Sequence, residues 1–175
     1  MVFTETGLPG VFVVDIEPRV DERGLFARSW CRAEFEAHGL DGRLVQCSIS
    51  RSDHRLTLRG LHYQAAPHAE VKLVRCTMGA IYDVIVDLRM DSPTRGKYFA
   101  AELSAANHRA LYVPEGFAHG FLTLAADSEV FYQMSEFYEP SCARGVRWND
   151  PAFAIEWPPA ERIIIERDQN YPDFS

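Results

Sequence analysis

The stretch from residue 44 to residue 138 constrains the fold most, because it reads as a close series of short apolar segments separated by turns. The segments are rich in β-branched and aromatic residues, as strands are. The expected turns include residues 77–79, 90–96 and 125–128. The expected strands are Val11–Ile16, Lys72–Cys76, Ala80–Leu88, Lys97–Leu103, Ala110–Val113, Gly120–Leu124 and Glu129–Tyr138. Closely spaced antiparallel strands predict an all-β protein, either a jelly roll or a small barrel.

One short N-terminal helix is predicted ahead of most of these strands, at residues 29–40. Ser29 is its expected N-cap and Gly39 its stop, with the apolar side chains of Trp30 and Phe35 between them. Residues 148–159 are expected to wrap the surface as coil, and the tail after them to carry little regular structure. No repeat or linker divides the chain, so residues 1–175 are expected to form a single domain.

Composition excludes several classes of protein. The formal net charge of −7 argues against a general nucleic-acid-binding protein, because such a protein needs a basic face. The first ten residues lack the pattern of a secretory signal, and no window predicts a membrane span. The four scattered cysteines (Cys31, Cys47, Cys76 and Cys142) form no C-x-x-C pair. These observations predict a cytoplasmic protein with free thiols and no membrane or nucleic-acid partner.

The segment Arg59-Gly60-Leu61-His62-Tyr63-Gln64 places a cation and a histidine close together. A lone histidine beside a strand is more often a packed or surface residue than a base. Arg59 favours the functional interpretation, because a guanidinium binds phosphate in a bidentate way. Lys72 opens an apolar strand, where a lysine is usually a snorkelling surface residue. In a cavity, the same ammonium would stabilise a developing oxyanion.

Two further candidates, Tyr132 and Asp168, lie later in the chain. Tyr132 belongs to the expected strand 129–138, which has aromatic residues on both faces, so the pattern leaves open which face lines a pocket. A core tyrosine with a satisfied hydroxyl is the simpler interpretation. Asp168 stands in a charged run that is a solvated surface by default, although a carboxylate there could orient a histidine.

Residues 114–119, with the pattern Pro-x-Gly-x-x-His, resemble the second motif of cupins, the jelly rolls that often hold a metal. The first cupin motif requires His-x-His and a later Glu, whereas this chain has His62-Tyr63-Gln64. An amide is a poor metal donor, so no metal site and no cofactor are expected.

Taken together, these motifs resemble the dTDP-4-dehydrorhamnose 3,5-epimerase family, a branch of the cupins, over about residues 8–173. The motifs that carry the resemblance are Asp21-x-Arg23-Gly24-x-Phe26, Leu58 to Gln64, Lys72-Leu73-Val74-Arg75, Asp83-Val84-x-Val86-Asp87-Leu88-Arg89, Ser92-Pro93-Thr94, residues 113–121, Tyr132, Arg144-Gly145-x-x-Trp148-x-Asp150-Pro151 and Asp168.

The resemblance implies a cupin-type jelly roll that works as a homodimer without a metal. It implies inversion of carbon 3, carbon 5 or both in a nucleotide-linked 4-keto-6-deoxy sugar, for deoxysugar or surface-polysaccharide biosynthesis. In family terms His62 removes the proton beside the ketone, Asp168 orients His62, Lys72 stabilises the enolate oxygen, and Tyr132 returns a proton from the opposite face. A phenol has a reference pKa of about 10 and is therefore protonated at neutral pH.

The substrate-binding positions implied by the resemblance are Arg23, Phe26, Arg28, Gln46, Ser48, Arg59, His119, Tyr138 and Arg167. Three positions depart from the usual family pattern. Arg28 and Ala143 each replace a glutamate, and Gln46-Cys47-Ser48-Ile49 replaces Gln-Asp-Asn-His. These departures lead to the hypothesis that the nucleotide or the sugar differs from that of the rhamnose pathway.

Two alternatives remain beside the epimerase. One is a different enzyme on the same fold, a 3,4-ketoisomerase or a metal-dependent oxygenase. The other is a sugar-binding jelly roll without catalysis, which would have no need of an acid opposite a base.

Overall fold

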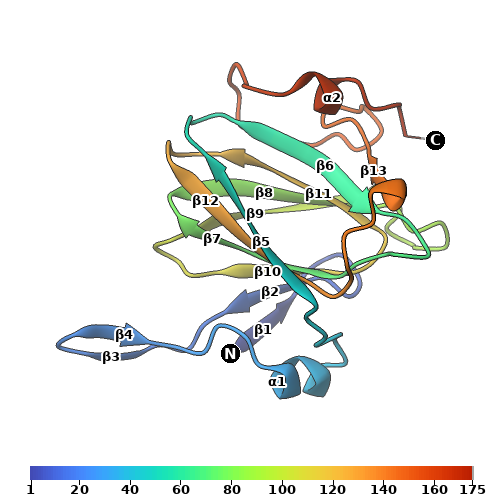
Figure 1. Ribbon diagram of the computed structural model, residues 1–175. Coiled ribbons are helices and arrows are strands. Elements are labelled where there is room, and N and C mark those ends of the chain that lie inside the picture. The colour runs from blue at the N-terminus through green and yellow to red at the C-terminus, as the bar shows by residue number, and fades with distance from the viewer. Residues whose placement is uncertain (175) are drawn as a thin grey trace.

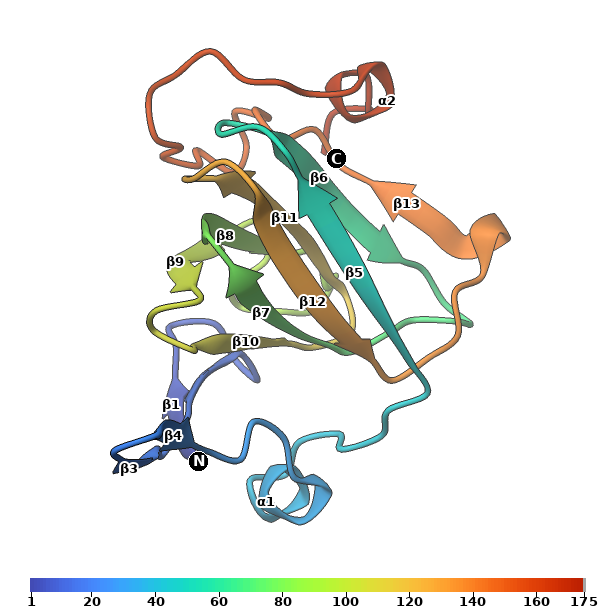
Figure 2. The same cartoon turned by 60° about the vertical axis from the view of Figure 1, so that its left-hand side comes forward.

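The computed structural model describes residues 1–174 and consists mainly of two antiparallel sheets packed face to face (Figures 1 and 2). The strands are β1 Val2–Glu5, β2 Phe12–Asp15, β3 Arg19–Asp21, β4 Gly24–Phe26, β5 Gln46–Ser52, β6 Leu58–Gln64, β7 Lys72–Met78, β8 Ala80–Asp87, β9 Tyr98–Ser104, β10 Ala110–Val113, β11 Phe117–Thr123, β12 Ser128–Met134 and β13 Ala143–Gly145. The helices are α1 Arg32–Ala37, α2 Glu166–Gln169 and a single 3₁₀ turn, η1, at Pro140–Cys142. The predicted cupin-type jelly roll is confirmed.

One sheet has the strand order β1-β2-β10-β7-β12-β5, and the other has the order β13-β6-β11-β8-β9. Side chains alternate between the two faces of each strand, so every second residue points into the space between the sheets. Val74 and Val130 of the first sheet meet Ile85 and Phe121 of the second in the main core. Burial of such apolar area is the principal stabilising contribution to the fold.

Each sheet also has a covered outer face. Phe35 of α1 packs with Leu73 and Tyr112 on the outside of the six-stranded sheet. The C-terminal coil covers the outside of the five-stranded sheet, where Phe153 is buried in the same cluster as Val84. The coil predicted at 148–159 is therefore confirmed.

Most of the predicted strands are confirmed, and Ala110–Val113 is found with the predicted bounds. The strand predicted at 129–138 ends at Met134, so residues 135–138 were assigned wrongly. Six strands were not individually predicted, namely β1, β3, β4, β5, β6 and β13. The tail, expected to carry little regular structure, contains the single turn of α2.

The predicted helix is shorter than expected. It spans Arg32–Ala37, and Cys31 occupies its N-cap without a side-chain hydrogen bond, so the assignment of Ser29 as cap is wrong. Gly39 follows the helix with φ near +71°, a left-handed conformation that suits glycine and ends the helix as predicted.

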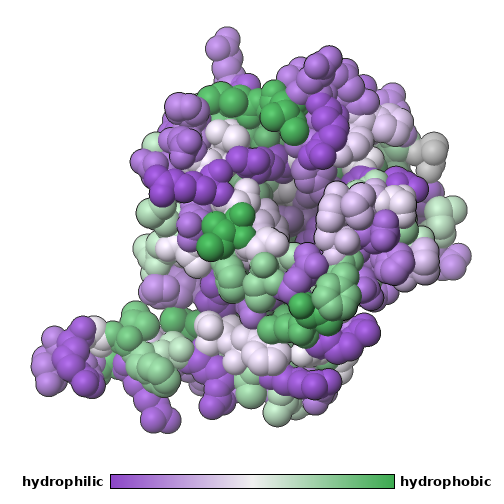
Figure 3. Space-filling view, in the orientation of Figure 1, coloured by the Kyte–Doolittle hydropathy of each residue, from purple (hydrophilic) through white to green (hydrophobic). Residues whose placement is uncertain are grey.

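A two-stranded arm, β3–β4, projects from the body of the molecule (Figures 1 and 2). Its turn contains Arg23, and all six residues of its strands are exposed. The arm carries green, hydrophobic atoms behind a purple tip (Figure 3). On this arm Val20 and Phe26 are 75% and 77% exposed.

No helix within residues 1–174 is both long and apolar enough to cross a membrane. All four cysteines are free, as predicted, with Cys76 and Cys142 buried.

Candidate active site

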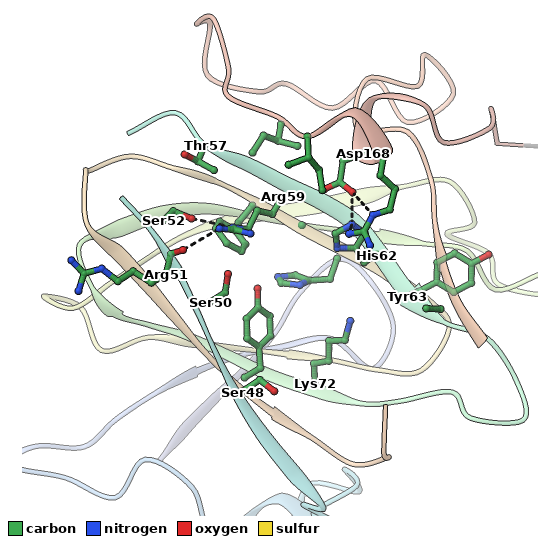
Figure 4. Close-up of a pocket in the computed structure, with 18 of the residues that line it drawn as sticks. Ser48, Ser50, Arg51, Ser52, Thr57, Arg59, His62, Tyr63, Lys72 and Asp168 are labelled. Carbon is green, nitrogen blue, oxygen red and sulfur yellow. Dashed lines mark hydrogen bonds and ion pairs between the residues drawn. The ribbon is translucent and has the colours of Figure 1, made fainter. Parts of the chain in front are cut away.

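A pocket of about 750 Å³ opens between the two sheets, beside strands β5 and β6. Its volume lies in the range of small-molecule sites. The six-stranded sheet contributes residues of β5, β7 and β12, and the five-stranded sheet contributes residues of β6, β11 and β13. Figure 4 shows the polar side chains that converge on this space.

His62 and Asp168 form a pair at one wall of the pocket. His62 Nε2 lies 2.9 Å from Asp168 Oδ1, although the two residues are 106 positions apart in the chain. Asp168 is buried in α2, and its second oxygen accepts a hydrogen bond from the backbone N–H of Gly60 at 3.0 Å. When Nε2–H donates to Asp168, the lone pair on Nδ1 is the basic site of the ring.

Asp168 remains a carboxylate at neutral pH. Burial acts to raise its pKa, but the hydrogen bonds from His62 and from Gly60 lower it below the ordinary value. Arg167 adds to this effect through its Nε, 3.2 Å from Asp168 Oδ1. A fixed negative charge at this place orients the imidazole and stabilises its protonated form.

Tyr132 lies across the pocket from His62, on β12 of the other sheet. Its ring packs at the edge of the main core, and within residues 1–174 its hydroxyl has no hydrogen-bond partner. Burial raises the pKa of this phenol, and the nearby charge of Asp83 acts in the same direction. The hydroxyl therefore keeps its proton at neutral pH and is available to a ligand.

Lys72 enters the pocket from β7, and its side chain extends toward the side where His62 lies (Figure 4). Its Nζ is 3.1 Å from Glu70 Oε1, and both side chains are largely shielded from solvent. Lys72 is therefore a pocket cation rather than the snorkelling surface residue of the simpler interpretation. Glu70 is a pocket residue that the sequence did not single out.

Arg59 is held at the other end of the pocket. Its Nε donates to Ser52 Oγ at 3.1 Å and its Nη2 to the carbonyl of Arg51 at 3.0 Å (Figure 4). These bonds link β6 to β5 across the gap between the sheets. The guanidinium is thus fixed where a phosphate can be bound.

Glycine is required where β6 and β11 approach one another behind the pocket. A Cβ atom on Gly120 would lie 2.6 Å from the backbone oxygen of Arg59, and one on Gly60 would lie 2.7 Å from the Cα atom of Gly120. Both contacts are with backbone atoms and cannot be relieved by a side-chain rotation. This close approach brings His62 and His119 next to each other as cross-strand partners.

The pocket contains most of the residues that the sequence suggested, but not all of them. It brings together Gln46, Ser48, Arg59, His62, Lys72, His119, Tyr132, Tyr138, Arg167 and Asp168. Arg23, Phe26 and Arg28 are outside the pocket of their own chain. Arg23 is on the projecting arm, and Arg28 donates to Glu34 at 2.7 Å beside α1.

Several pocket residues were missed by the sequence reasoning. Tyr171 contacts the His62 ring edge-on, with ring centroids 5.9 Å apart, and Ile163 and Ile165 line the pocket from the C-terminal segment. No periodic pattern marks them, because the segment that carries them has almost no regular structure. Gln64, in contrast, does not serve the site: its amide donates to backbone carbonyls of His68 and Phe137.

Comparison with known proteins agrees with this geometry. The family model described as dTDP-4-dehydrorhamnose 3,5-epimerase matches residues 5–175. The chain is 43% identical to the dTDP-4-dehydrorhamnose 3,5-epimerase of Shigella flexneri, over 97% of this chain and 94% of that protein.

Solved structures give the same result. The crystal structure of dTDP-4-dehydrorhamnose 3,5-epimerase from Elizabethkingia anophelis NUHP1 superposes with a TM-score of 0.96 at 41% identity, covering 99% of this chain and 96% of that one. The enzyme from Legionella pneumophila Philadelphia 1, solved in complex with dTDP-4-keto-L-rhamnose, gives a TM-score of 0.89 at 35% identity, covering 95% and 89%. The chain belongs to the dTDP-4-dehydrorhamnose 3,5-epimerase family, and it is an enzyme of the isomerase class.

Proposed function

We propose that this enzyme inverts both carbon 3 and carbon 5 of a dTDP-linked 4-keto-6-deoxyhexose, yielding dTDP-4-keto-L-rhamnose. One observation carries the proposal: His62, paired with Asp168 of α2, and Tyr132 come from two facing sheets and line the same pocket. Inversion requires a base on one face of the carbon and an acid on the other. The ligand bound to the Legionella relative and the names of the family members support the choice of sugar.

The reaction follows from the acidity of hydrogens beside a ketone. The His62 lone pair takes the proton from the carbon, and the electron pair of the C–H bond moves into an enolate. The Lys72 ammonium stabilises the enolate oxygen electrostatically. The Tyr132 O–H then gives its proton to the opposite face of the carbon, which inverts the centre and leaves a phenolate and an imidazolium. Asp168 stabilises the imidazolium through its hydrogen bond with His62.

The sequence led to the alternative hypothesis that the nucleotide or sugar is not that of the rhamnose pathway. Of the three altered positions, Ser48 and Ala143 line the pocket, whereas Arg28 is bound to Glu34 outside it. The charge change at Arg28 is therefore remote from the ligand of its own chain. We infer that the three changes together leave the preference for dTDP intact, as the names of the relatives indicate.

A comparison of nucleotides tests this assignment. We expect kcat/KM for the dTDP-linked 4-ketosugar to exceed the values for the CDP-, GDP- and UDP-linked sugars by about tenfold or more, equivalent to about 1.4 kcal/mol. In D₂O, deuterium should appear at both carbons of the product, as read by NMR. A preference for another nucleotide would support the hypothesis drawn from Ser48 and Ala143 instead.

We further propose that the active form is a homodimer in which the β3–β4 arm serves the pocket of the partner. Two-stranded hairpins are marginally stable in water on their own. This arm nevertheless exposes Val20, Leu25 and Phe26, which a second copy would bury. The proposal also gives a role to Arg23 and Phe26, which the family resemblance assigns to substrate binding although they lie outside their own pocket.

Mixing two inactive variants tests the exchange of arms. His62→Ala has an intact arm, and the double variant Arg23→Ala, Phe26→Ala has an intact base. Random pairing would place one complete site in half of the dimers, so mixing and reassociation should restore about a quarter of the wild-type activity. If both sets of residues served the same chain, the mixture would stay inactive.

A cytoplasmic location is part of the same proposal. The four free cysteines are consistent with a reducing compartment.

A further inference from the structure

The pocket contains a second aspartate–histidine pair that the reaction above does not use. His119 Nε2 lies 2.7 Å from Asp83 Oδ1, with His119 on β11 and Asp83 on the neighbouring strand β8. His119 is the direct cross-strand partner of His62. The two pairs therefore stand side by side, His62 with Asp168 and His119 with Asp83.

Asp83 is unusually placed for a carboxylate. It is completely buried on the inner face of β8, and its second oxygen, Oδ2, has no hydrogen-bond partner among residues 1–174. Burial raises the pKa of this carboxyl, while the charges of His119 and Lys72 act in the opposite direction. A buried carboxylate with one unpaired oxygen reduces stability. An apolar side chain at this position would make the folded protein more stable. The presence of a carboxylate instead suggests that it has a function.

The pair contacts the proposed acid. The His119 and Tyr132 rings meet edge to face, with centroids 5.8 Å apart and planes at 77°. Because Asp83 occupies Nε2, the other ring nitrogen of His119 is left without a partner among the described residues, and the ring lines the pocket. The charged or titratable groups around Asp83 are His119 from β11, Lys72 and Cys76 from β7, and Tyr132 from β12.

An enzyme that inverts two carbons of one substrate must return its acid and its base to their starting protonation states between the two steps. The first inversion leaves Tyr132 as a phenolate and His62 as an imidazolium. Before the second carbon can be inverted in the same binding event, the phenol proton must be restored and the base must lose its proton. His62 is one-third exposed and can release its proton to water. Tyr132, at the edge of the core, requires a local donor.

We propose that the Asp83–His119 pair is the proton relay that restores the Tyr132 hydroxyl between the two inversions. His119 Nδ1–H gives its proton to the phenolate oxygen, which leaves a neutral imidazole with Nε2–H bonded to the Asp83 carboxylate. A proton from water returns to Nδ1 before the next substrate. Asp83 is a positioning residue, because it acts only through His119. This inference rests on the proposed function.

The test is a single-turnover experiment with enzyme in excess over the dTDP-4-ketosugar in D₂O, followed by NMR. In Asp83→Asn we expect the second inversion to slow by about 10²-fold relative to the first, the lower end of typical acid–base contributions, so that sugar inverted at one carbon accumulates. His119→Asn should change the ratio of the two rates in the same direction. If the Asp83 variant fails to fold, the His119 variant still tests the relay.

Asp87→Asn is the matched control. Asp87 is equally buried on the same strand, but it is bonded to Arg89, Ser92 and Thr94, outside the pocket. This variant should lose stability without accumulating singly inverted sugar.

Two results would overturn the relay. Equal slowing of both inversions would mean that the pair shapes the pocket or binds substrate. An unchanged ratio of the two rates in both pocket variants would mean that water returns the proton to Tyr132. A wild-type enzyme that inverts a single carbon, or neither, would instead refute the proposed function.

Discussion

His62→Ala should abolish the exchange of sugar carbon-bound hydrogen with solvent while the protein remains folded. General bases typically contribute about 10²–10⁴-fold in rate, and no other group is paired with Asp168 in a position to replace the imidazole. The fold should persist because Asp168 keeps its hydrogen bonds from Gly60 and Arg167. Deuterium incorporation at carbons 3 and 5 in D₂O, read by NMR, is the measurement.

The control for this variant is His38→Ala. His38 lies beside α1, where it stacks on Phe3 with ring centroids 4.0 Å apart, and it does not line the pocket. Its removal should leave exchange at the wild-type rate. Deuterium incorporation near the wild-type rate in His62→Ala would remove His62 from the role of base.

Tyr132→Phe should separate exchange from inversion. The ring is retained, and the lost hydroxyl has no protein partner within the described chain, so the fold should be nearly unaffected. Proton removal by His62 can still occur, and the same face can be reprotonated by solvent-derived deuterium. Inversion should fall by about 10²–10⁴-fold, because no donor remains on the opposite face.

A matched control is Tyr82→Phe on β8. The Tyr82 hydroxyl donates to the carbonyl of Glu156 on the outer face of the sheet, away from the pocket. This variant should exchange and invert like the wild type. Equal loss of exchange and inversion in Tyr132→Phe would contradict the acid role and show that Tyr132 positions or polarises the substrate.

The strands that pack in the core were the easiest to predict from the sequence. Lys72–Met78, Ala80–Asp87 and Ala110–Val113 have long apolar runs, and each was expected within two residues of its observed bounds. β5 and β6 were harder because they line the pocket. β5 reads Gln-Cys-Ser-Ile-Ser-Arg-Ser, and a wall that contacts a polar ligand lacks the apolar pattern of a buried strand.

The sequence pattern could not show which face of the strand Tyr132 occupies, because aromatic residues occur on both faces of its segment. In the structure Val130 and Tyr132 share the inner face, where Val130 is completely buried between the sheets. Strand pairing decided this, because β12 is hydrogen-bonded to both β5 and β7, which fixes the face that it turns to the core.

The length of the N-terminal helix was overestimated because the sequence pattern does not show how its apolar residues pack. Apolar residues from Trp30 to Leu40 suggested three turns, but Trp30 packs against the core cluster from outside the helix. Tertiary packing thus overrode local propensity, which is a weak determinant for short segments.

By itself, the sequence determined the all-β class, the order of the strands along the chain and the membership of the family, because these depend on local apolar patterns and on motifs that are contiguous in the chain. The resemblance implied that Asp168 orients His62, but only the tertiary structure showed which groups are in contact. The His62–Asp168 pair joins residues 106 positions apart, and the Asp83–His119 pair depends on the pairing of β8 with β11. The projection of Arg23 and Phe26 away from their own pocket was equally invisible. Such relations depend on long-range strand pairing and on burial, and a pattern of neighbouring residues does not encode either.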